Sequence, residues 1–258
     1  MQICDFAFIN QGKVIRPLEQ QEAHYLLPID KVITPHHDHA LLLLHGFASS
    51  PAVYRAMLPH IHGYDRIVCP VLPGHADSIQ AFSQSTAQDW RDTAYHHCAK
   101  LVDHYTQVSI AGLSLGGLLA LELSSTFQIY HLYLLAPALK LRCAKMSYLA
   151  ARLLRSMGCK TVTNHGGNFF SDQYQELTYR RLPISAIVEV LSFIQSQKYR
   201  QPNCSTHLFL GRYDKIVDSQ SIAKQYTNQL QVQIHWLEHS AHVLPLDGDI
   251  DLLLHHIR

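Results

Sequence analysis

A serine lies between two glycines at residues 112–116, where the sequence reads Gly-Leu-Ser-Leu-Gly. A serine hydroxyl is a weak nucleophile by itself and reacts only when a base lies beside it. The apolar run 107–111 before the motif predicts a strand, and the run 115–124 after it predicts a helix. A serine at such a strand-to-helix turn lies at the tip of a sharp bend, and the flanking glycines leave room for the crossing. The pattern therefore predicts Ser114 as a nucleophile for acyl transfer.

The helix that begins behind this serine adds an electrostatic element. The first backbone N–H groups of a helix lack intrahelical partners and lie at its positive end. The N–H of Leu115 would then face the oxygen that becomes negative when the serine attacks a carbonyl. We expect Leu115 to supply one donor of an oxyanion hole.

A carboxylate that could orient the base is expected after the predicted strand 207–210, because open α/β sheets bind ligands at the carboxyl ends of their strands. Asp214 follows that strand closely, after Gly-Arg-Tyr. Asp218 is the alternative, but it lies just before a predicted helix, where a role as N-cap would account for it. Asp214 is therefore preferred.

The base is expected last in the chain, after the final predicted strand 232–237. The loop that follows contains two candidates, His239 and His242. One histidine among 19 carries little information alone, but the chain order Ser, Asp, His is the order that this type of strand-to-helix serine site uses. Either histidine satisfies that order.

Short apolar runs alternate with segments of helical period along the chain. This alternation predicts a mainly parallel sheet with helices on both faces, an α/β fold in a single domain over 1–258. The predicted strands are 40–44, 66–69, 107–111, 129–135, 207–210 and 232–237. The stretch 138–203 interrupts the alternation with two amphipathic stripes, and we interpret it as a small helical cap inserted between strands.

Four segments together resemble one known family, the α/β-hydrolase superfamily, and within it the small bacterial carboxylesterases related to monoacylglycerol lipases. The segments are Leu44-His45-Gly46-Phe47, Ala111 to Gly117, Gly211-Arg212-Tyr213-Asp214 and Ser240-Ala241-His242-Val243, in the family's order. The resemblance implies the α/β-hydrolase fold and a Ser114, Asp214, His242 triad, with His239 as the less favoured base. It also implies that the N–H of Phe47 is the second oxyanion donor. We expect His45 in the same loop to be structural.

Composition limits the other possibilities. Net charge is +1, so no strong field attracts nucleic acid, and no apolar run is long enough to predict an integral membrane segment. The six cysteines show neither a zinc-type spacing nor a dense disulfide pattern, and no signal peptide is recognisable, which together favour a cytoplasmic protein. The adjacent pair 255–256 lies in a predicted helix, where neighbouring side chains diverge. No metal and no cofactor are predicted.

The predicted function is hydrolysis of small-molecule carboxylic esters through an acyl-enzyme on Ser114. The apolar stripes of the cap suggest short- to medium-chain acyl esters or monoacylglycerols, unless these stripes merely pack the cap onto the body. A thioesterase or lysophospholipase with the same triad, and a non-catalytic ligand-binding relative, are the alternatives. Oligomeric state is not predicted.

Overall fold

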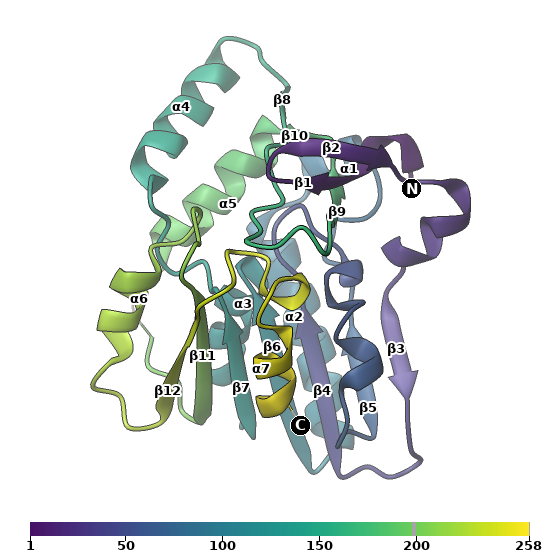
Figure 1. The fold of residues 1–258 in the computed structure, drawn as a ribbon, viewed down its shortest axis with the longest axis vertical. Coiled ribbons are helices and arrows are strands. Elements are labelled where there is room, and N and C mark those ends of the chain that lie inside the picture. Colours follow the sequence, from purple (N-terminus) through teal and green to yellow (C-terminus); the bar gives the residue numbers. More distant parts are fainter. Residues whose placement is uncertain (198–199, 258) are drawn as a thin grey trace.

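A twisted, mainly parallel sheet forms the centre of the computed structural model, which describes residues 1–197 and 200–257 (Figure 1). Within those residues the sheet has seven strands in the order β12-β11-β7-β6-β4-β5-β3. Only β3 runs antiparallel to its neighbour among these described strands. The strands are β3 Ile29–Val32, β4 His39–Leu44, β5 Arg66–Cys69, β6 Gln107–Leu113, β7 His131–Leu135, β11 Ser205–Gly211 and β12 Val232–Leu237.

The central strands are apolar on both faces because helices cover both sides of the sheet. The residues of β4 from 40 to 44 are all inaccessible to solvent, and β6 and β7 are buried from their second residue onward. Continuous Leu, Ile and Val runs are typical of strands in this position. The predicted mainly parallel sheet flanked by helices is confirmed.

Ser78, Thr86 and Asp218 each cap the helix that follows by accepting one of its free backbone N–H groups. Thr86 caps α2 in a reciprocal capping box with Asp89, and Trp90 on this helix is fully buried. Figure 1 shows α2 and α3 behind the sheet and α7 in front of it. The helices are α1 Ile79–Gln84, α2 Ala87–His104, α3 Leu115–Ser124, α4 Ala144–Ser156, α5 Ile184–Ser196, α6 Ser219–Tyr226 and α7 Ile250–His256.

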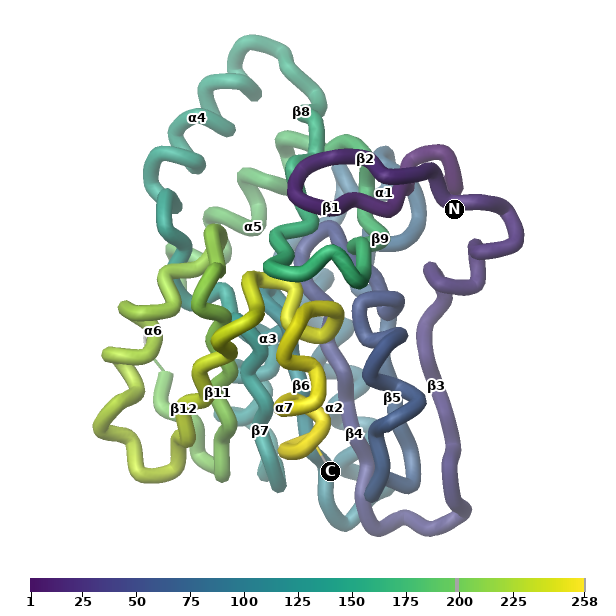
Figure 2. The backbone as a smooth tube through the Cα atoms, in the orientation of Figure 1, coloured from purple at the N-terminus to yellow at the C-terminus, as the bar shows by residue number. Residues whose placement is uncertain are grey.

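A second, smaller sheet lies above the carboxyl ends of the central strands and joins the N-terminal hairpin to the inserted segment (Figure 1). It pairs β1 (Phe6–Asn10) antiparallel with β2 (Lys13–Pro17) on one side and with β9 (Glu176–Tyr179) on the other. Figure 2 shows the N-terminal hairpin beside β9. The sequence predicts no helix or strand within residues 1–38, because the alternation in β1 is short and its second partner, β9, is distant in the chain.

The segment 138–203 contains the two helices that its stripes predict, α4 and α5. It also contains strands, since β8 (Thr161–Thr163) pairs with β10 (Arg181–Pro183) and β9 extends the N-terminal hairpin. The inserted segment is therefore mixed rather than purely helical. Its β-branched and aromatic residues at 161–163 and 177–179 fit strands better than helices.

The two predicted stripes have different surroundings. The stripe on α5 is largely buried, with Leu191 5% and Ile194 8% exposed. The stripe on α4 faces solvent, with Met146 74% and Leu149 66% exposed. The expectation that both stripes bury apolar surface is thus met by α5 and not by α4, because α4 contacts the protein through its other side, where Ala151 is buried.

No helix among residues 1–197 and 200–257 has the length and apolar character that crossing a membrane requires.

Candidate active site

Ser114 lies between the end of β6 and the first residue of α3, as the sequence predicts, and its backbone is strained. Its φ is 54°, a left-handed value that is uncommon for a residue with a side chain. The turn is possible because two glycines allow backbone to cross backbone. A Cβ on Gly112 would lie 2.2 Å from the carbonyl oxygen of Gly116, and one on Gly116 would lie 2.1 Å from that of Leu44. Strain of this kind persists only where the surrounding structure enforces it.

Three predicted residues from distant parts of the chain form one hydrogen-bonded relay. The Oγ of Ser114 is 3.0 Å from Nε2 of His242, and Nδ1 of His242 is 2.8 Å from Oδ2 of Asp214. The Asp214 side chain is inaccessible to solvent and that of His242 is 11% exposed. The geometry fits a base that accepts the serine proton on Nε2 while a carboxylate holds its Nδ1–H.

The carboxylate of Asp214 is fixed by its own loop. Its other oxygen, Oδ1, accepts the backbone N–H groups of Ile216 at 2.7 Å and Val217 at 2.9 Å. Arg142 donates from Nε to the carbonyl oxygen of Asp214 at 2.9 Å. The carboxylate therefore has one oxygen occupied by the loop and the other directed at His242.

The two alternative residues lie outside the relay. Asp218 is the N-cap of α6 and accepts the N–H of Ser221 at 3.1 Å, which is the capping role that the sequence suggested. His239 is exposed, and its Nδ1 lies 3.4 Å from a carboxylate oxygen of Asp249. Neither residue contacts Ser114 or His242 in the hydrogen bonds of the described residues.

The imidazole of His242 is more basic than an ordinary histidine. Burial lowers its pKa, but the Asp214 carboxylate outweighs this by its charge and its hydrogen bond, and Glu176 adds to the effect. The net result is a pKa above the usual value. Glu176 lies on β9, and its own pKa is raised because the carboxyl is buried. Sequence reasoning did not identify Glu176, since β9 is distant in sequence from the predicted site.

The loop after β4 lies against the serine. A Cβ on Gly46 would be 3.4 Å from Cβ of Ser114, so the loop that carries the adjacent Phe47 borders the nucleophile. Leu115 follows Ser114 directly as the first residue of α3. The two predicted oxyanion donors thus come from the two segments that border the serine.

His45 in this loop has no capacity left for proton transfer. Its Nδ1–H donates to the carbonyl oxygen of Gly46 at 2.9 Å, and its Nε2 accepts the N–H of Leu72 at 3.0 Å. Burial lowers its pKa to about 4. A neutral imidazole with both nitrogens engaged by backbone fits the structural role expected from the sequence.

A buried carboxylate that sequence reasoning missed connects the inserted segment to the His242 loop. Asp247 is fully buried and accepts the N–H groups of Phe170 and Ser171 at 2.9 Å each, and that of Ala241 at 2.8 Å. The N–H of His242 also donates to the carbonyl of Asn168 at 3.0 Å. Local sequence gave no signal, because these partners are far apart in the chain.

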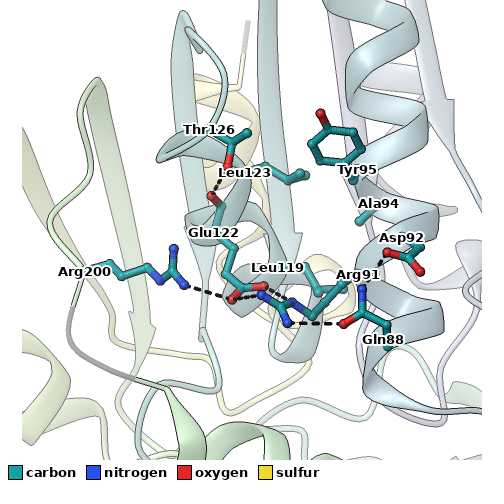
Figure 3. Close-up of a pocket in the computed structure, with 10 residues that line it drawn as sticks. All are labelled: Gln88, Arg91, Asp92, Ala94, Tyr95, Leu119, Glu122, Leu123, Thr126 and Arg200. Carbon is teal, nitrogen blue, oxygen red and sulfur yellow. Dashed lines mark hydrogen bonds and ion pairs between the residues drawn. The ribbon is translucent and has the colours of Figure 1, made fainter.

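A cavity of about 200 Å³ between α2 and α3 lies apart from these residues (Figure 3). Arg91 and Arg200 both point at Glu122 in it, with N···O distances of 2.9 and 3.2 Å. None of Ser114, Asp214 and His242 lines it. Because the charged side chains in this cavity pair with one another, we assign these ion pairs a structural role and not a ligand-binding one.

The comparisons with known proteins agree with this architecture. The sequence profile described as the alpha/beta hydrolase family matches residues 41–252, so the chain belongs to that family. A carboxylesterase of Bacillus subtilis (strain 168) is 23% identical over 237 residues, covering 86% of this chain and 94% of the relative. A thermostable monoacylglycerol lipase of Bacillus sp. (strain H-257) is 22% identical over 220 residues, covering 83% and 86%.

Solved structures show the same fold at low identity. A structure from work on LipS and LipT, two metagenome-derived lipolytic enzymes, gives a TM-score of 0.76 at 23% identity, covering 89% of this chain and 94% of that one. The monoacylglycerol lipase of Paleococcus ferrophilus gives 0.66 at 13% identity, covering 89% and 96%. Both structures share the α/β-hydrolase fold with this chain.

Proposed function

We propose that the chain is a serine carboxylesterase that hydrolyses short- to medium-chain acyl esters or monoacylglycerols. The observation that carries the proposal is the relay of Ser114, His242 and Asp214, with distances of 3.0 and 2.8 Å, at a strained strand-to-helix turn. The similarity to a carboxylesterase and a monoacylglycerol lipase over most of the chain supports the choice of ester substrates.

The reaction follows from the positions of these atoms. Nε2 of His242 takes the proton as Oγ of Ser114 attacks the ester carbonyl carbon, and the carbonyl oxygen becomes an oxyanion. The N–H groups of Phe47 and Leu115 would hold this oxyanion, and losing one such donor typically costs about 2.7–4 kcal/mol. His242 then returns the proton to the leaving alcohol. Asp214 keeps the ring oriented and stabilises the imidazolium.

The second half-reaction uses the same groups on water. His242 removes a proton from a water molecule, whose oxygen attacks the acyl carbon bonded to Ser114 Oγ. Collapse of the second oxyanion breaks the acyl–oxygen bond, and the imidazolium returns its proton to Ser114. The products are a carboxylic acid and free enzyme, with no cofactor consumed.

A p-nitrophenyl ester series from acetate to decanoate tests the proposal on wild type and Ser114→Ala. We expect turnover by the wild type and a loss on the order of 10⁴–10⁶-fold in the variant, because the nucleophile is gone. A maximum at intermediate chain length would support an apolar acyl site, and an equal kcat/KM for every ester would contradict it.

Labelling by a fluorophosphonate separates the alternatives. If Ser114 is labelled and the enzyme prefers acyl thioesters or lysophospholipids to carboxylic esters, the assignment changes to a thioesterase or a lysophospholipase. Absence of both labelling and turnover in the folded wild type would favour a non-catalytic ligand-binding protein.

A further inference from the structure

Three histidines that are far apart in sequence converge between the sheet edge and the last helix. His207 lies on β11, His235 on the adjacent edge strand β12, and His256 at the end of α7, which Figure 1 shows in front of the sheet. Their ring centroids are 5.2 Å apart for His207 and His235, 5.0 Å for His207 and His256, and 4.2 Å for His235 and His256. All three side chains are half-buried, so solvent reaches the group.

The ring nitrogens have a spacing that suits a shared ligand. One nitrogen from each ring lies within 4.8 Å of the others, and Nδ1 of His207 is 3.0 Å from Nε2 of His235. Imidazole nitrogens bind zinc at about 2.0–2.1 Å, so two of them in a tetrahedral complex are roughly 3.3 Å apart. Small ring rotations would therefore bring all three nitrogens to one ion.

Neutral imidazoles are the form that binds metals. The hydrogen bond between Nδ1 of His207 and Nε2 of His235 requires that one of these two nitrogens carries no proton. A fourth ring, His131 on β7, lies 6.2 Å from His207 between centroids. Protonated rings this close would repel one another, whereas neutral rings could each offer a nitrogen lone pair to a common cation.

We propose that His207, His235 and His256 form a binding site for a divalent transition-metal ion, with zinc as the best fit. Three imidazoles leave one tetrahedral position for a water molecule, which the exposure of the site allows. The proton now shared between His207 and His235 would move to the other nitrogen of its own ring. Binding then needs no net loss of a proton from the neutral rings.

The position of the site indicates what the ion would do. The loop 238–249, which carries His242, begins just after His235 on β12 and ends just before α7, which carries His256. Ser114 lies beyond the carboxyl end of β6, whereas His207 is near the start of β11. The ion would therefore hold the end of α7, the helix that follows the His242 loop, against β11 and β12, away from Ser114.

Zinc binding to the untagged chain, in buffer free of chelators, tests the proposal. We expect one equivalent of Zn²⁺ by calorimetry and a rise in Tm of about 5–10 °C at a hundredfold excess over Kd. X-ray absorption should give only nitrogen or oxygen ligands at about 2.0–2.1 Å, whereas a cysteine site would add sulfur at about 2.3 Å. His207→Gln and His235→Gln should each abolish the stoichiometric binding and the Tm rise.

His255→Gln is the matched control, because His255 is the exposed neighbour of His256 on the same helix and should leave binding unchanged. Binding that survives His207→Gln, or sulfur in the first coordination shell, would overturn the proposal, as would the absence of stoichiometric binding by the wild type. Unfolding of the metal-free variants would be recognised by circular dichroism. If a variant unfolds, the Zn²⁺ stoichiometry and the X-ray absorption spectrum of the wild type still test the proposed site.

Discussion

Two aspartates four positions apart, Asp214 and Asp218, differ in what surrounds their carboxylates. That of Asp214 is inaccessible to solvent and divides its oxygens between a backbone turn and His242. That of Asp218 is 29% exposed and caps α6. Replacing each aspartate by asparagine should therefore affect activity at Asp214 and not at Asp218.

Asp214→Asn should lower kcat by about 10⁴-fold, because the new amide can donate to Nδ1 and fix the wrong tautomer of His242. Asp218→Asn should leave kcat unchanged and alter the free energy of unfolding by less than about 0.5 kcal/mol, since asparagine is an equally good N-cap. Steady-state ester hydrolysis and urea unfolding measure both. Equal losses of kcat in the two variants would contradict the assignment of roles.

A second prediction at the scale of the residue concerns Glu176 and the pH dependence of kcat/KM. His242 must be neutral to act as base, so kcat/KM should fall in acid with an apparent pKa above the ordinary histidine value of about 6.5. Glu176→Gln removes one of the negative charges that raise this pKa, and should therefore move the acidic limb to lower pH.

The control is Glu238→Gln, a substitution of a glutamate whose side chain is 57% exposed and paired with Arg212. A full pH profile of kcat/KM for wild type and both variants gives the answer. If the acidic limb stays in place in Glu176→Gln, or moves equally in Glu238→Gln, the inference that the charge of Glu176 raises the pKa of His242 is contradicted.

At the scale of the element, α4 and α5 show how one sequence pattern can have two outcomes. Both are 13-residue helices with an apolar stripe, but only the stripe of α5 is covered by the protein. The helical spacing of apolar residues predicts an apolar face on the helix, but it does not predict whether other parts of the protein cover that face. The sequence could therefore predict both helices but not their burial.

Leucine-to-alanine substitutions on the two helices should separate these environments. Leu191→Ala on α5 should lower the free energy of unfolding by about 2–5 kcal/mol, because it leaves a cavity in packed core. Leu149→Ala on α4 should change it by less than about 0.5 kcal/mol, since that side chain is 66% exposed. Urea denaturation of both variants tests this, and a comparable loss in Leu149→Ala would show that α4 is covered in solution.

The strands of the central sheet were largely predictable, because their apolar runs are continuous and each is followed by a turn. β12 has the bounds expected from sequence, and β5 likewise. Strands β1, β2 and β9 were not predicted, and β1 pairs with β9 across more than 160 positions, a distance that no local pattern can report. At the site, local motifs predict Ser114. Asp247 and Glu176 could not be predicted, because their partners come from segments that are distant in the chain and adjacent only in the fold.

At the scale of the whole molecule, the histidines govern the response to acid. Within the part of the chain that the structure describes, seven histidines show a lowered pKa, and for each the largest cause is burial. In the unfolded chain these rings would take up protons near pH 6.5, whereas in the folded chain they resist protonation until lower pH. The unfolded state binds more protons in this window, and folding becomes less favourable as the pH falls.

The free energy of unfolding should therefore decrease between pH 7 and pH 5, above the range in which most carboxylates titrate. His242 acts in the opposite direction because its pKa is raised, but it is one group against seven. Urea unfolding at half-unit pH intervals measures the slope. A stability that is constant or rises toward pH 5 would contradict the burial of these rings.

The pairing of β1 with β9 has a consequence for synthesis on the ribosome. Residues 6–10 are made first, but their partner at 176–179 follows on the order of 10–30 s later at ordinary elongation rates. During that interval a strand with buried apolar residues, Phe6 and Phe8 among them, has one edge without its native partner. Truncated chains that end before β9 would keep this edge open, and an open apolar edge is a template for aggregation.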